Sequence, residues 1–455
     1  MVDDSAALDR LSELDRRLVA TVKGIKLLGA VSWPASVQTQ FLEGWRRGAA
    51  RLPQVEYAHA DFSRTRSDLA DIYAAADPQH PVGDYLRRTA QSWRVATELL
   101  DAAGTMDITA HSVRLFGRPG DRLPGGSVSN IDAARHFIEL ADELGREIGI
   151  EDERGRIPAE ELCVELQQRI SAFFSHDKIT VVLDPDLIAK AAAGPTRIRL
   201  RSGTSFSDYD RHQLLEHEAF VHSLTALNGR EQPHLKSLAL NSPRITATQE
   251  GLATFAELMS GAIDIGRMKR ISLRILAIDM ALGGADFIEV FKFFLDAGQI
   301  DTDSFTSAMR VFRGAPTGGG AAFTKDAVYL HGLLSVHTFF RWALKNQKLK
   351  LCRSLFAGKM TLHDVLALEP YFDSGYIAPP AYIPPWVQRA NGLAGTLAFS
   401  LFANRIRLDR VEADDLMLGL WRRRAAGDLA VLRKLQPAIR GDASAWRPLP
   451  TRVAY

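Results

Sequence analysis

The stretch His217-Glu218-Ala219-Phe220-Val221-His222 carries two imidazoles and a carboxylate close together in the sequence. It reads H-E-x-x-x-H, one residue longer than the zinc-peptidase signature H-E-x-x-H. Neutral imidazoles are good zinc ligands, and a carboxylate beside them can accept a proton from an attacking water molecule. His217 and His222 are therefore candidate metal ligands, and Glu218 is a candidate catalytic base.

The spacing of the two histidines raises a geometric problem. At about 100° per residue, His217 and His222 lie roughly 140° apart on a regular α-helix, too far to bind one ion. One inserted residue, in the form of a π-bulge, would reduce this offset to about 40°. The sequence therefore predicts a π-bulge between the histidines, unless the motif is accidental. A capping-box pattern at Ser207–Asp210 and a stop signal at Asn228-Gly229 mark the ends of this helix.

A third ligand is offered by the stretch Thr246-Ala247-Thr248-Gln249-Glu250-Gly251. Thr246 and Gln249 form a second capping-box pattern, which places Glu250 in the first turn of another helix. Gly251 disfavours a helix by about 1 kcal/mol relative to Ala, but it would allow two helices to approach closely. Catalytic zinc sites of the His-His-Glu type take a carboxylate from such a neighbouring helix and keep the fourth position for water.

The paired motifs HEAFVH and TQEGLA resemble those of a bacterial family named for its QEGLA motif and labelled as modulators of flavohemoglobin expression. They also resemble those of the related microtubule-associated tyrosine carboxypeptidases. The resemblance runs from about Lys178 to Trp386 and includes Phe323-Thr324-Lys325-Asp326. It implies a zinc metallopeptidase fold in which the two histidines and Glu250 hold zinc (Zn2+) and Glu218 is the base. The bacterial label concerns expression and implies no chemistry.

Length and composition are those of an ordinary globular protein. The 455 residues suffice for two or three domains, and 46% of them are hydrophobic and 24% charged. A net charge of +2 gives no overall signal for binding nucleic acid or a membrane. Cys163 and Cys352 lie far apart without a C-x-x-C pattern, which favours two reduced thiols. The acidic N-terminus does not read as a signal peptide, so we expect a cytoplasmic protein.

The hydrophobic periodicity predicts an α+β protein that is mostly helical with a small sheet, and the resemblance implies a zincin-like metallopeptidase core. Residues 1–150 read as an N-terminal helical module. Residues 151–410 are expected to form the catalytic domain, and residues 411–455 a basic C-terminal helical tail. Such a tail could bind an acidic partner or nucleic acid, but a solvated terminal helix is the favoured interpretation.

Two strands are predicted before the histidine helix, at Ile179–Leu183 and Arg197–Arg201. In the second strand arginines alternate with aliphatic residues, a pattern that suits the edge of a sheet. Such an edge could pair with an extended substrate by strand addition, or it could be a plain solvated edge. The sequence leaves both interpretations open.

Glu257 follows Glu250 on the same face of the predicted helix. From there it could orient His217 or His222 through a hydrogen bond to the metal ligand. A surface salt bridge is the alternative, and the sequence favours this second interpretation.

Arg310, Arg313, Lys325 and Tyr329 form a group of predicted substrate-binding residues. Lys325 and Tyr329 lie four positions apart and so share one face of a helix. The cations and the phenol could bind the C-terminal carboxylate of a substrate and stabilise the oxyanion formed during hydrolysis. The alternative is that Lys325 pairs with Asp326 or with another acid at the surface.

The sequence therefore predicts a zinc-dependent metallopeptidase, and more narrowly a carboxypeptidase acting on the C-terminus of a peptide or protein. The alternative is a regulatory binding protein with a structural zinc site and a basic tail that makes the contacts. Glu218 favours the enzyme, because a structural zinc site needs no free base and usually closes its fourth position. The sequence does not decide the substrate, the preferred terminal residue, carboxypeptidase against endopeptidase, or the oligomeric state.

Overall fold

The computed structural model describes residues 4–148, 157–174, 179–185, 187, 190–194 and 196–404. Over these ranges the architecture is mostly helical with two small sheets, which confirms the expected α+β class. The predicted basic tail at residues 411–455 lies outside the described residues. No helix in the described ranges is long and apolar enough to cross a membrane.

The helices and strands have the following bounds. The α-helices are α1 (Asp4–Val22), α2 (Leu27–Ala30), α3 (Ala35–Arg46), α4 (Ser63–Ala75), α5 (Pro81–Asp101), α6 (Ile108–Phe116), α7 (Asn130–Ile148), α8 (Ala159–Phe174), α9 (Asp208–Gln213), α10 (Leu224–Glu231), α11 (Thr246–Ser260), α12 (Ile265–Leu282), α13 (Phe287–Asp296), α14 (Asp301–Phe312), α15 (Val328–Lys345), α16 (Leu349–Ser354), α17 (Leu362–Ala367), α18 (Glu369–Asp373), α19 (Pro385–Gln388) and α20 (Ala390–Ala403). A π-helix, η1 (Leu214–Ser223), joins α9 to α10, and the 3-10 helices are η2 (Lys236–Ala239), η3 (Pro243–Ile245) and η4 (Thr324–Ala327). The strands are β1 (Ile157–Pro158), β2 (Thr180–Asp184), β3 (Ala191–Ala193), β4 (Arg197–Arg201) and β5 (Ser205–Phe206).

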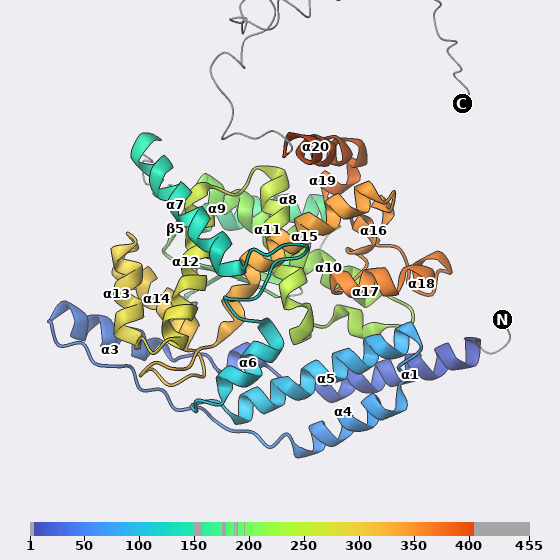
Figure 1. The fold of residues 1–455 in the computed structure, drawn as a ribbon, viewed down its shortest axis with the longest axis horizontal. Helices are drawn as coiled ribbons and strands as arrows, with labels where there is room; N and C mark the ends of the chain where they lie inside the picture. The colour runs from blue at the N-terminus through green and yellow to red at the C-terminus, as the bar shows by residue number, and fades with distance from the viewer. Residues whose placement is uncertain are drawn as a thin grey trace, which may run out of the picture. The chain divides into compact units, whose positions relative to one another are not determined.

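The first helix of the N-terminal region is α1. Its apolar stripe, Leu11, Leu14, Leu18 and Val22, is buried, and the helix packs beside α4 and α5 (Figure 1). These buried side chains share one hydrophobic cluster with residues at positions 235, 238 and 357–377. The N-terminal helices therefore pack against segments that lie far along the chain.

The described residues up to Leu397 form one compact unit, and those from Ala398 onward belong to a second. The described part of the second unit is the end of α20 and the residue that follows it, Asn404. The division into a helical module, a catalytic domain and a tail at residues 150 and 410 stays a prediction.

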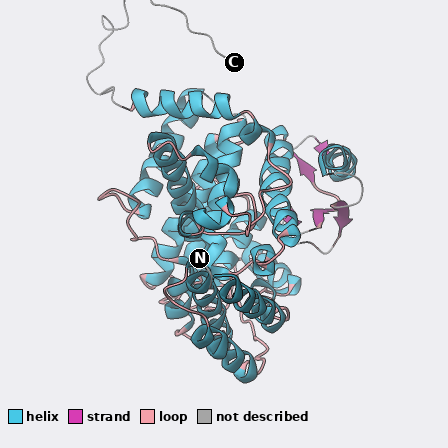
Figure 2. Ribbon diagram, turned by 90° about the vertical axis from the view of Figure 1, so that its right-hand side faces the viewer, coloured by secondary structure: helices cyan, strands magenta, loops and turns pink. Residues whose placement is uncertain are grey.

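The predicted strands at residues 179–183 and 197–201 are confirmed as β2 and β4, but β4 is not an edge strand. The sheet has the order β2-β4-β3, so β4 pairs parallel with β2 on one side and antiparallel with β3 on the other. The edge prediction was wrong because β3 is a short alanine run without the usual strand residues. Figure 2 shows the strands gathered at one side of the otherwise helical unit.

The predicted close approach of two helices at Gly251 is confirmed. A Cβ added to Gly251 of α11 would lie 2.2 Å from the carbonyl carbon of Gly332 in α15. The predicted capping box at Thr246 and Gln249 is wrong, because Thr246 is already helical and its hydroxyl donates to the carbonyl of Pro243. Glu250 consequently lies at the start of the second turn of α11.

Gly229 does not end the histidine helix as predicted, since α10 continues to Glu231. The glycine is required by packing instead. A Cβ at this position would lie 2.2 Å from the carbonyl oxygen of Leu238, which belongs to η2. The neighbouring Asn228 is buried, and its amide nitrogen donates to the carbonyls of Phe356 and Tyr382. Thus the Asn-Gly pair joins the helix to later segments of the chain.

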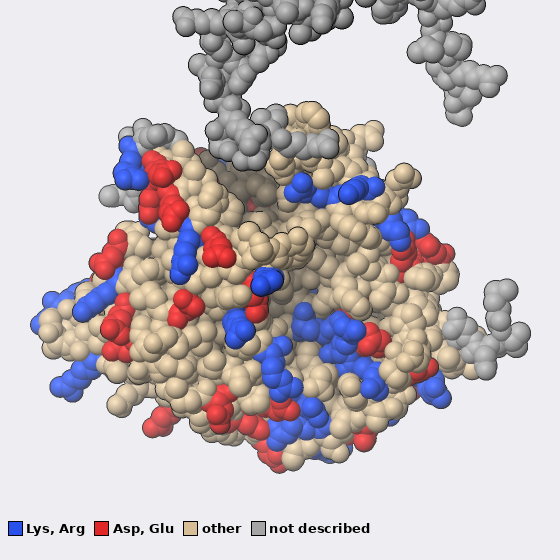
Figure 3. All heavy atoms as spheres, in the orientation of Figure 1, with Lys and Arg blue, Asp and Glu red and all other residues tan. Residues whose placement is uncertain are grey.

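Both signs of charge occur over the face of the molecule that Figure 3 shows, with uncharged residues between them. Arg88 and Asp84 of α5 form one exposed ion pair. Pairs of this kind contribute about 0–1 kcal/mol each to stability.

Candidate metal centre

The histidine helix begins at the capping box that the sequence predicts. The Ser207 hydroxyl accepts from the backbone N–H of Asp210, and the Asp210 carboxylate accepts from the backbone N–H of Ser207. The predicted π-bulge is also confirmed, since the segment Leu214–Ser223 is π-helical throughout. The wider π turn brings His217 and His222 onto one face, with ring centroids 4.8 Å apart. The sequence motif and the helix geometry are therefore consistent with each other.

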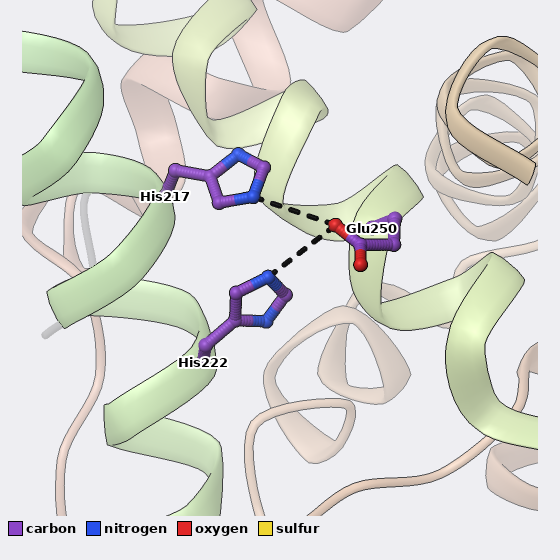
Figure 4. Close-up of side chains that lie close together, drawn as sticks. All are labelled: His217, His222 and Glu250. Carbon is purple, nitrogen blue, oxygen red and sulfur yellow. Dashed lines mark ion pairs between the residues drawn. The ribbon is translucent and has the colours of Figure 1, made fainter. Parts of the chain in front are cut away.

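His217, His222 and Glu250 converge on one point (Figure 4). Glu250 Oε2 lies 3.5 Å from Nε2 of His217 and 3.5 Å from Nε2 of His222. One ligand atom from each residue can be chosen so that all lie within 4.8 Å of one another. Ligands at ordinary zinc distances are about 3.4 Å apart around a tetrahedral ion. The two imidazoles and the carboxylate therefore fit a metal ion in both chemistry and spacing.

Glu257 contacts Nδ1 of His217, the ring nitrogen that does not face Glu250. Its Oε1 lies 2.6 Å from Nδ1 of His217, and its carboxylate accepts two hydrogen bonds from Arg267, at 2.6 and 2.8 Å. Glu257 is fully buried, so the favoured surface salt bridge was wrong and the orienting role is the one the geometry supports. Because Nδ1 is engaged by Glu257, Nε2 of His217 is directed towards Glu250.

The ionisation of His217 and that of the carboxylates it contacts depend on each other. Burial lowers the pKa of His217, but its hydrogen bonds with Glu250 and Glu257 outweigh that effect and raise the pKa to about 10. For Glu257 burial raises the pKa, while Arg267 and His217 bring it below its ordinary value. Without a metal, His217 is therefore the proton-bearing partner of two carboxylates.

Glu250 has a different partner on each carboxylate oxygen. Its Oε2 faces the imidazoles, whereas its Oε1 accepts a hydrogen bond of 2.9 Å from Nζ of Lys325. Burial opposes ionisation of Glu250, yet Lys325 and the imidazoles hold its pKa well below the ordinary value. The predicted substrate-binding lysine thus contacts a candidate metal ligand.

Glu218 lies next to His217 on the π-helix and is half-buried. Within the described ranges its carboxylate makes no hydrogen bond or ion pair. Arg267 and Lys359 are close enough to interact with it electrostatically. A carboxylate in this position remains available to accept a proton from a molecule bound beside the ligands.

A sequence model of the microtubule-associated tyrosine carboxypeptidase family matches residues 40–405. The chain belongs to this family. The match extends beyond both ends of the stretch at residues 178–386 that resembles the family by its motifs. Membership in the microtubule-associated tyrosine carboxypeptidase family makes this a carboxypeptidase-type enzyme. The relation to the QEGLA-motif proteins stays a prediction.

Comparisons with individual proteins add little to the family assignment. The solved structure of metallocarboxypeptidase 1 from Trypanosoma cruzi aligns with 88% of this chain and 98% of its own, at 14% sequence identity and a TM-score of 0.39. At that TM-score the alignment supports no conclusion about fold or reaction. A comparison with curated proteins gives no match.

The other predicted substrate-binding residues of this family member cluster around Tyr329. Three cations lie near its ring centroid: Lys325 Nζ at 5.0 Å, Arg274 at 5.8 Å and Arg310 at 6.0 Å. Arg310 donates to both oxygens of Asp326, at 2.6 and 2.8 Å, and to the Tyr329 hydroxyl at 3.3 Å. The structure therefore brings Lys325, Tyr329 and Arg310 together and gives Arg310 a carboxylate partner.

Arg313 also lies in this cationic group. Its Nε is buried without a hydrogen-bond partner among the residues that the structure describes. Burial and the nearby Arg310 lower the pKa of Arg313 to about 10, and the same two causes lower that of Arg274 to about 10. Cations outnumber carboxylates here, so the group is electrostatically suited to an anion.

Sequence reasoning missed two buried polar residues beside the ligands. Gln249 accepts at Oε1 from the Thr225 hydroxyl, at 3.0 Å, and from Lys359 Nζ, at 3.5 Å. Its Nε2 is buried without a hydrogen-bond partner in the described part of the chain. Burial lowers the pKa of Lys359 to about 8. The sequence could have signalled Gln249 by its place before Glu250, but nothing distinguished Lys359 from a surface lysine.

Proposed function

We propose that this chain is a zinc-dependent carboxypeptidase that removes the C-terminal residue of a peptide or protein. The observation that carries the proposal is the convergence of His217, His222 and Glu250, beside Glu218, whose carboxylate has no partner among the described residues. Two imidazoles and one carboxylate are the donor set of catalytic zinc sites, which keep a position for water or substrate. Membership in a carboxypeptidase family supports the same reaction class.

Glu218 is the proposed general base. A bound zinc ion would act as a Lewis acid and make a water molecule acidic enough to lose a proton near neutral pH. The Glu218 carboxylate would accept that proton as the water attacks the scissile carbonyl. It would then deliver the proton to the nitrogen of the departing residue. General acid–base assistance of this kind is worth about 10²–10⁴ in rate.

The cationic group around Tyr329 is the proposed anchor for the C-terminal carboxylate. A desolvated carboxylate without a cation costs several kcal/mol, so a carboxypeptidase needs such an anchor. Of the predicted residues, Arg310 is bonded to Asp326 and Lys325 to Glu250. Arg313 keeps a buried donor without a partner among described residues, and it is the strongest candidate to bind the carboxylate.

An extended substrate would pair with β3 rather than with β4. The central strand β4 has both sides occupied, whereas one side of β3 has no partner strand among the described residues. The carbonyl of Gly194, just after β3, accepts from the hydroxyl of Ser223 at the end of η1. This hydrogen bond connects the edge of the sheet to the helix that carries the histidines.

The alternative function, a regulatory protein with a structural zinc site, gains no specific support. A structural site closes its fourth position with another protein ligand. The metal-binding group found in the described ranges has three residues, and Glu218 beside it has no partner there. The basic tail that would make the regulatory contacts lies outside the described residues.

The proposal is tested with the full-length protein loaded with zinc and a mixed library of free-acid peptides. Mass spectrometry of the products should show peptides shortened by one residue at the C-terminus. Products cut only at internal bonds would replace the carboxypeptidase by an endopeptidase. No cleavage by zinc-loaded protein, across a library that covers all terminal residues, would reject the proposed function.

A further inference from the structure

The two oxygens of Glu250 are held in different ways. Oε2 lies 3.5 Å from both imidazole Nε2 atoms, while Oε1 accepts from Nζ of Lys325 at 2.9 Å. A free carboxylate rotates about its terminal bond and presents either oxygen. The hydrogen bond from Lys325 fixes this rotation, so that one oxygen is directed between His217 and His222.

Lys325 is itself held firmly in place. It is 8% exposed and lies in η4, which is bonded to two other helices. The backbone N–H of Thr324 donates to the hydroxyl of Ser112 at 2.8 Å, and the side-chain amide of Asn130 donates to the carbonyl of Ala327 at 2.9 Å. A lysine fixed by such contacts on both sides has a defined direction, unlike a mobile surface lysine.

We propose that Lys325 is a positioning residue for the third metal ligand: it holds Glu250 Oε1 so that Oε2 faces the metal. The proposal rests on the proposed zinc site. It gives Glu250 the same kind of support that Glu257 gives His217, whose Nδ1 it engages at 2.6 Å. Supporting groups of this type orient the ligand atom before the metal arrives, and their loss typically costs about 10–100-fold in metal affinity.

A nearby positive charge without a positioning role would have the opposite effect. An ammonium group repels a divalent cation, so its removal alone should tighten metal binding. A lysine that only binds the substrate carboxylate should likewise leave metal binding unchanged or tighter, and should change KM instead. A loss of metal affinity therefore identifies the positioning role, and a change in KM separates the other two roles from each other.

The test compares Lys325→Met with Lys359→Met. Lys359 is a matched control, because it is also buried and interacts electrostatically with Glu250 and Glu218, but its Nζ contacts Gln249 at 3.5 Å rather than a carboxylate. Zinc affinity is measured by competition with a chromophoric chelator on the full-length protein. We expect about 10–100-fold weaker binding for Lys325→Met and unchanged or tighter binding for Lys359→Met.

A second readout uses cobalt in place of zinc. The visible absorption of bound cobalt reports the number and kind of its ligands, so it should change in Lys325→Met and stay like that of the wild type in Lys359→Met. Thermal unfolding of the metal-free proteins shows whether each variant is folded. Lys325→Arg, which keeps a charged donor, supplies the second variant and should bind zinc more tightly than Lys325→Met.

The outcomes separate this inference from the proposed function. Unchanged or tighter zinc binding by folded Lys325→Met would overturn the positioning role while leaving the zinc site of the wild type intact. Equal losses in Lys325→Met and Lys359→Met, or in Lys325→Met and Lys325→Arg, would also overturn it, because the effect would not depend on the bond to Glu250. Failure of the wild type to bind zinc would instead reject the proposed function.

Discussion

Gly251 in α11 and Gly332 in α15 lie in direct backbone contact. A Cβ on Gly332 would lie 2.1 Å from the carbonyl oxygen of Ala247, and one on Gly251 would lie 2.2 Å from Gly332 itself. No side chain separates the two helices at this crossing. Because Glu250 precedes Gly251 directly, the crossing also fixes how far the Glu250 carboxylate projects towards the histidines.

Gly251→Ala should destabilise the protein and weaken metal binding together. The three nearest atoms, 2.2 to 2.6 Å away, belong to the backbone of Gly332 in α15, so the helices must separate to admit a methyl group. Overpacking of this kind costs about 3 kcal/mol when the backbone has to move. Urea unfolding of the metal-free protein measures the first effect, and zinc affinity measures the second.

Gly395→Ala is the matched control for that substitution. Gly395 lies in α20, and a Cβ there would have no atom within 4 Å. Alanine is favoured over glycine in a helix by about 1 kcal/mol, so this variant should be neutral or slightly stabilised. Similar losses of stability in the two variants would show that the close crossing is not the cause.

Zinc should bind with one ion per chain, and His222→Ala should remove most of it. The substitution takes away one of the two imidazoles that face Glu250 Oε2. His212→Ala is the control, since His212 is exposed on α9 and its Nδ1 lies 2.9 Å from the backbone carbonyl oxygen of Asp208. Metal analysis after dialysis gives the zinc content. Full zinc content in His222→Ala would exclude His222 as a ligand.

Glu218→Gln should keep zinc and the fold but lose hydrolysis. Glutamine matches the shape of glutamate and cannot accept the proton from the attacking water. The expected loss in kcat is at least about 10²-fold, from the usual contribution of a general base. Rates are measured on any peptide that the wild type cleaves, at equal zinc content. Comparable turnover would remove Glu218 from the mechanism.

Amidation of a substrate's C-terminus should abolish its cleavage, while acetylation of its N-terminus should not. The amide carries no charge for the cationic group around Tyr329 to bind. Arg313→Met should accordingly raise KM for free-acid peptides and leave the zinc content unchanged. Equal rates on acid and amide peptides would indicate an endopeptidase that needs no terminal anchor.

Asp15 should make stability depend on pH. It is fully buried in α1 and accepts hydrogen bonds from the backbone N–H of Ser237, at 3.1 Å, and from the Ser237 hydroxyl. Burial raises the pKa of Asp15 from 3.8 to about 6, and the bonds from Ser237 oppose this only in part. The folded state therefore binds the proton more tightly, so the cost of ionising Asp15 is present above pH 6 and disappears as the pH falls towards 4.

Asp15→Asn should remove this cost. At pH 7.5 the free energy of unfolding should exceed that of the wild type by about 1–3 kcal/mol, and the difference should shrink at pH 5. Urea unfolding at both pH values measures the effect. Asp9→Asn, an exposed position on the same helix, is the control. A variant less stable than the wild type at both pH values would show that the bonds to Ser237 require the carboxylate.

The sequence predicted those parts of the centre that depend on local rules. The offset between His217 and His222 requires an extra residue in the helix, and the Ser207 capping box depends only on its own turn. Gly251 also indicated a close helix crossing. Glycine disfavours a helix, so a glycine within one suggests that a neighbouring helix approaches too closely for a side chain. Each of these features is set by a few neighbouring residues.

The predictions that were wrong and the contacts that were missed involve segments that lie far apart in the sequence. An alanine run such as β3 has no strand signal of its own and becomes a strand by pairing with β4. Similarly, the burial of Glu257 follows from its contact with Arg267 and the packing of α11 against other helices. The bond from Lys325 to Glu250 joins positions far apart in the sequence, and no spacing rule reveals such a pair.

The π-helix sets the rotational phase between two halves of one continuous helix. The upstream half carries His217, whose Nδ1 contacts Glu257. The downstream half carries Asn228 and is followed directly by Gln232, and both side chains bind carbonyls between positions 356 and 382. If the same residues followed an ordinary α-helical path, His222 and everything after it would turn by about 100° relative to His217. The convergence of the two imidazoles and the contacts of Asn228 and Gln232 with later segments therefore depend on the same π-helix.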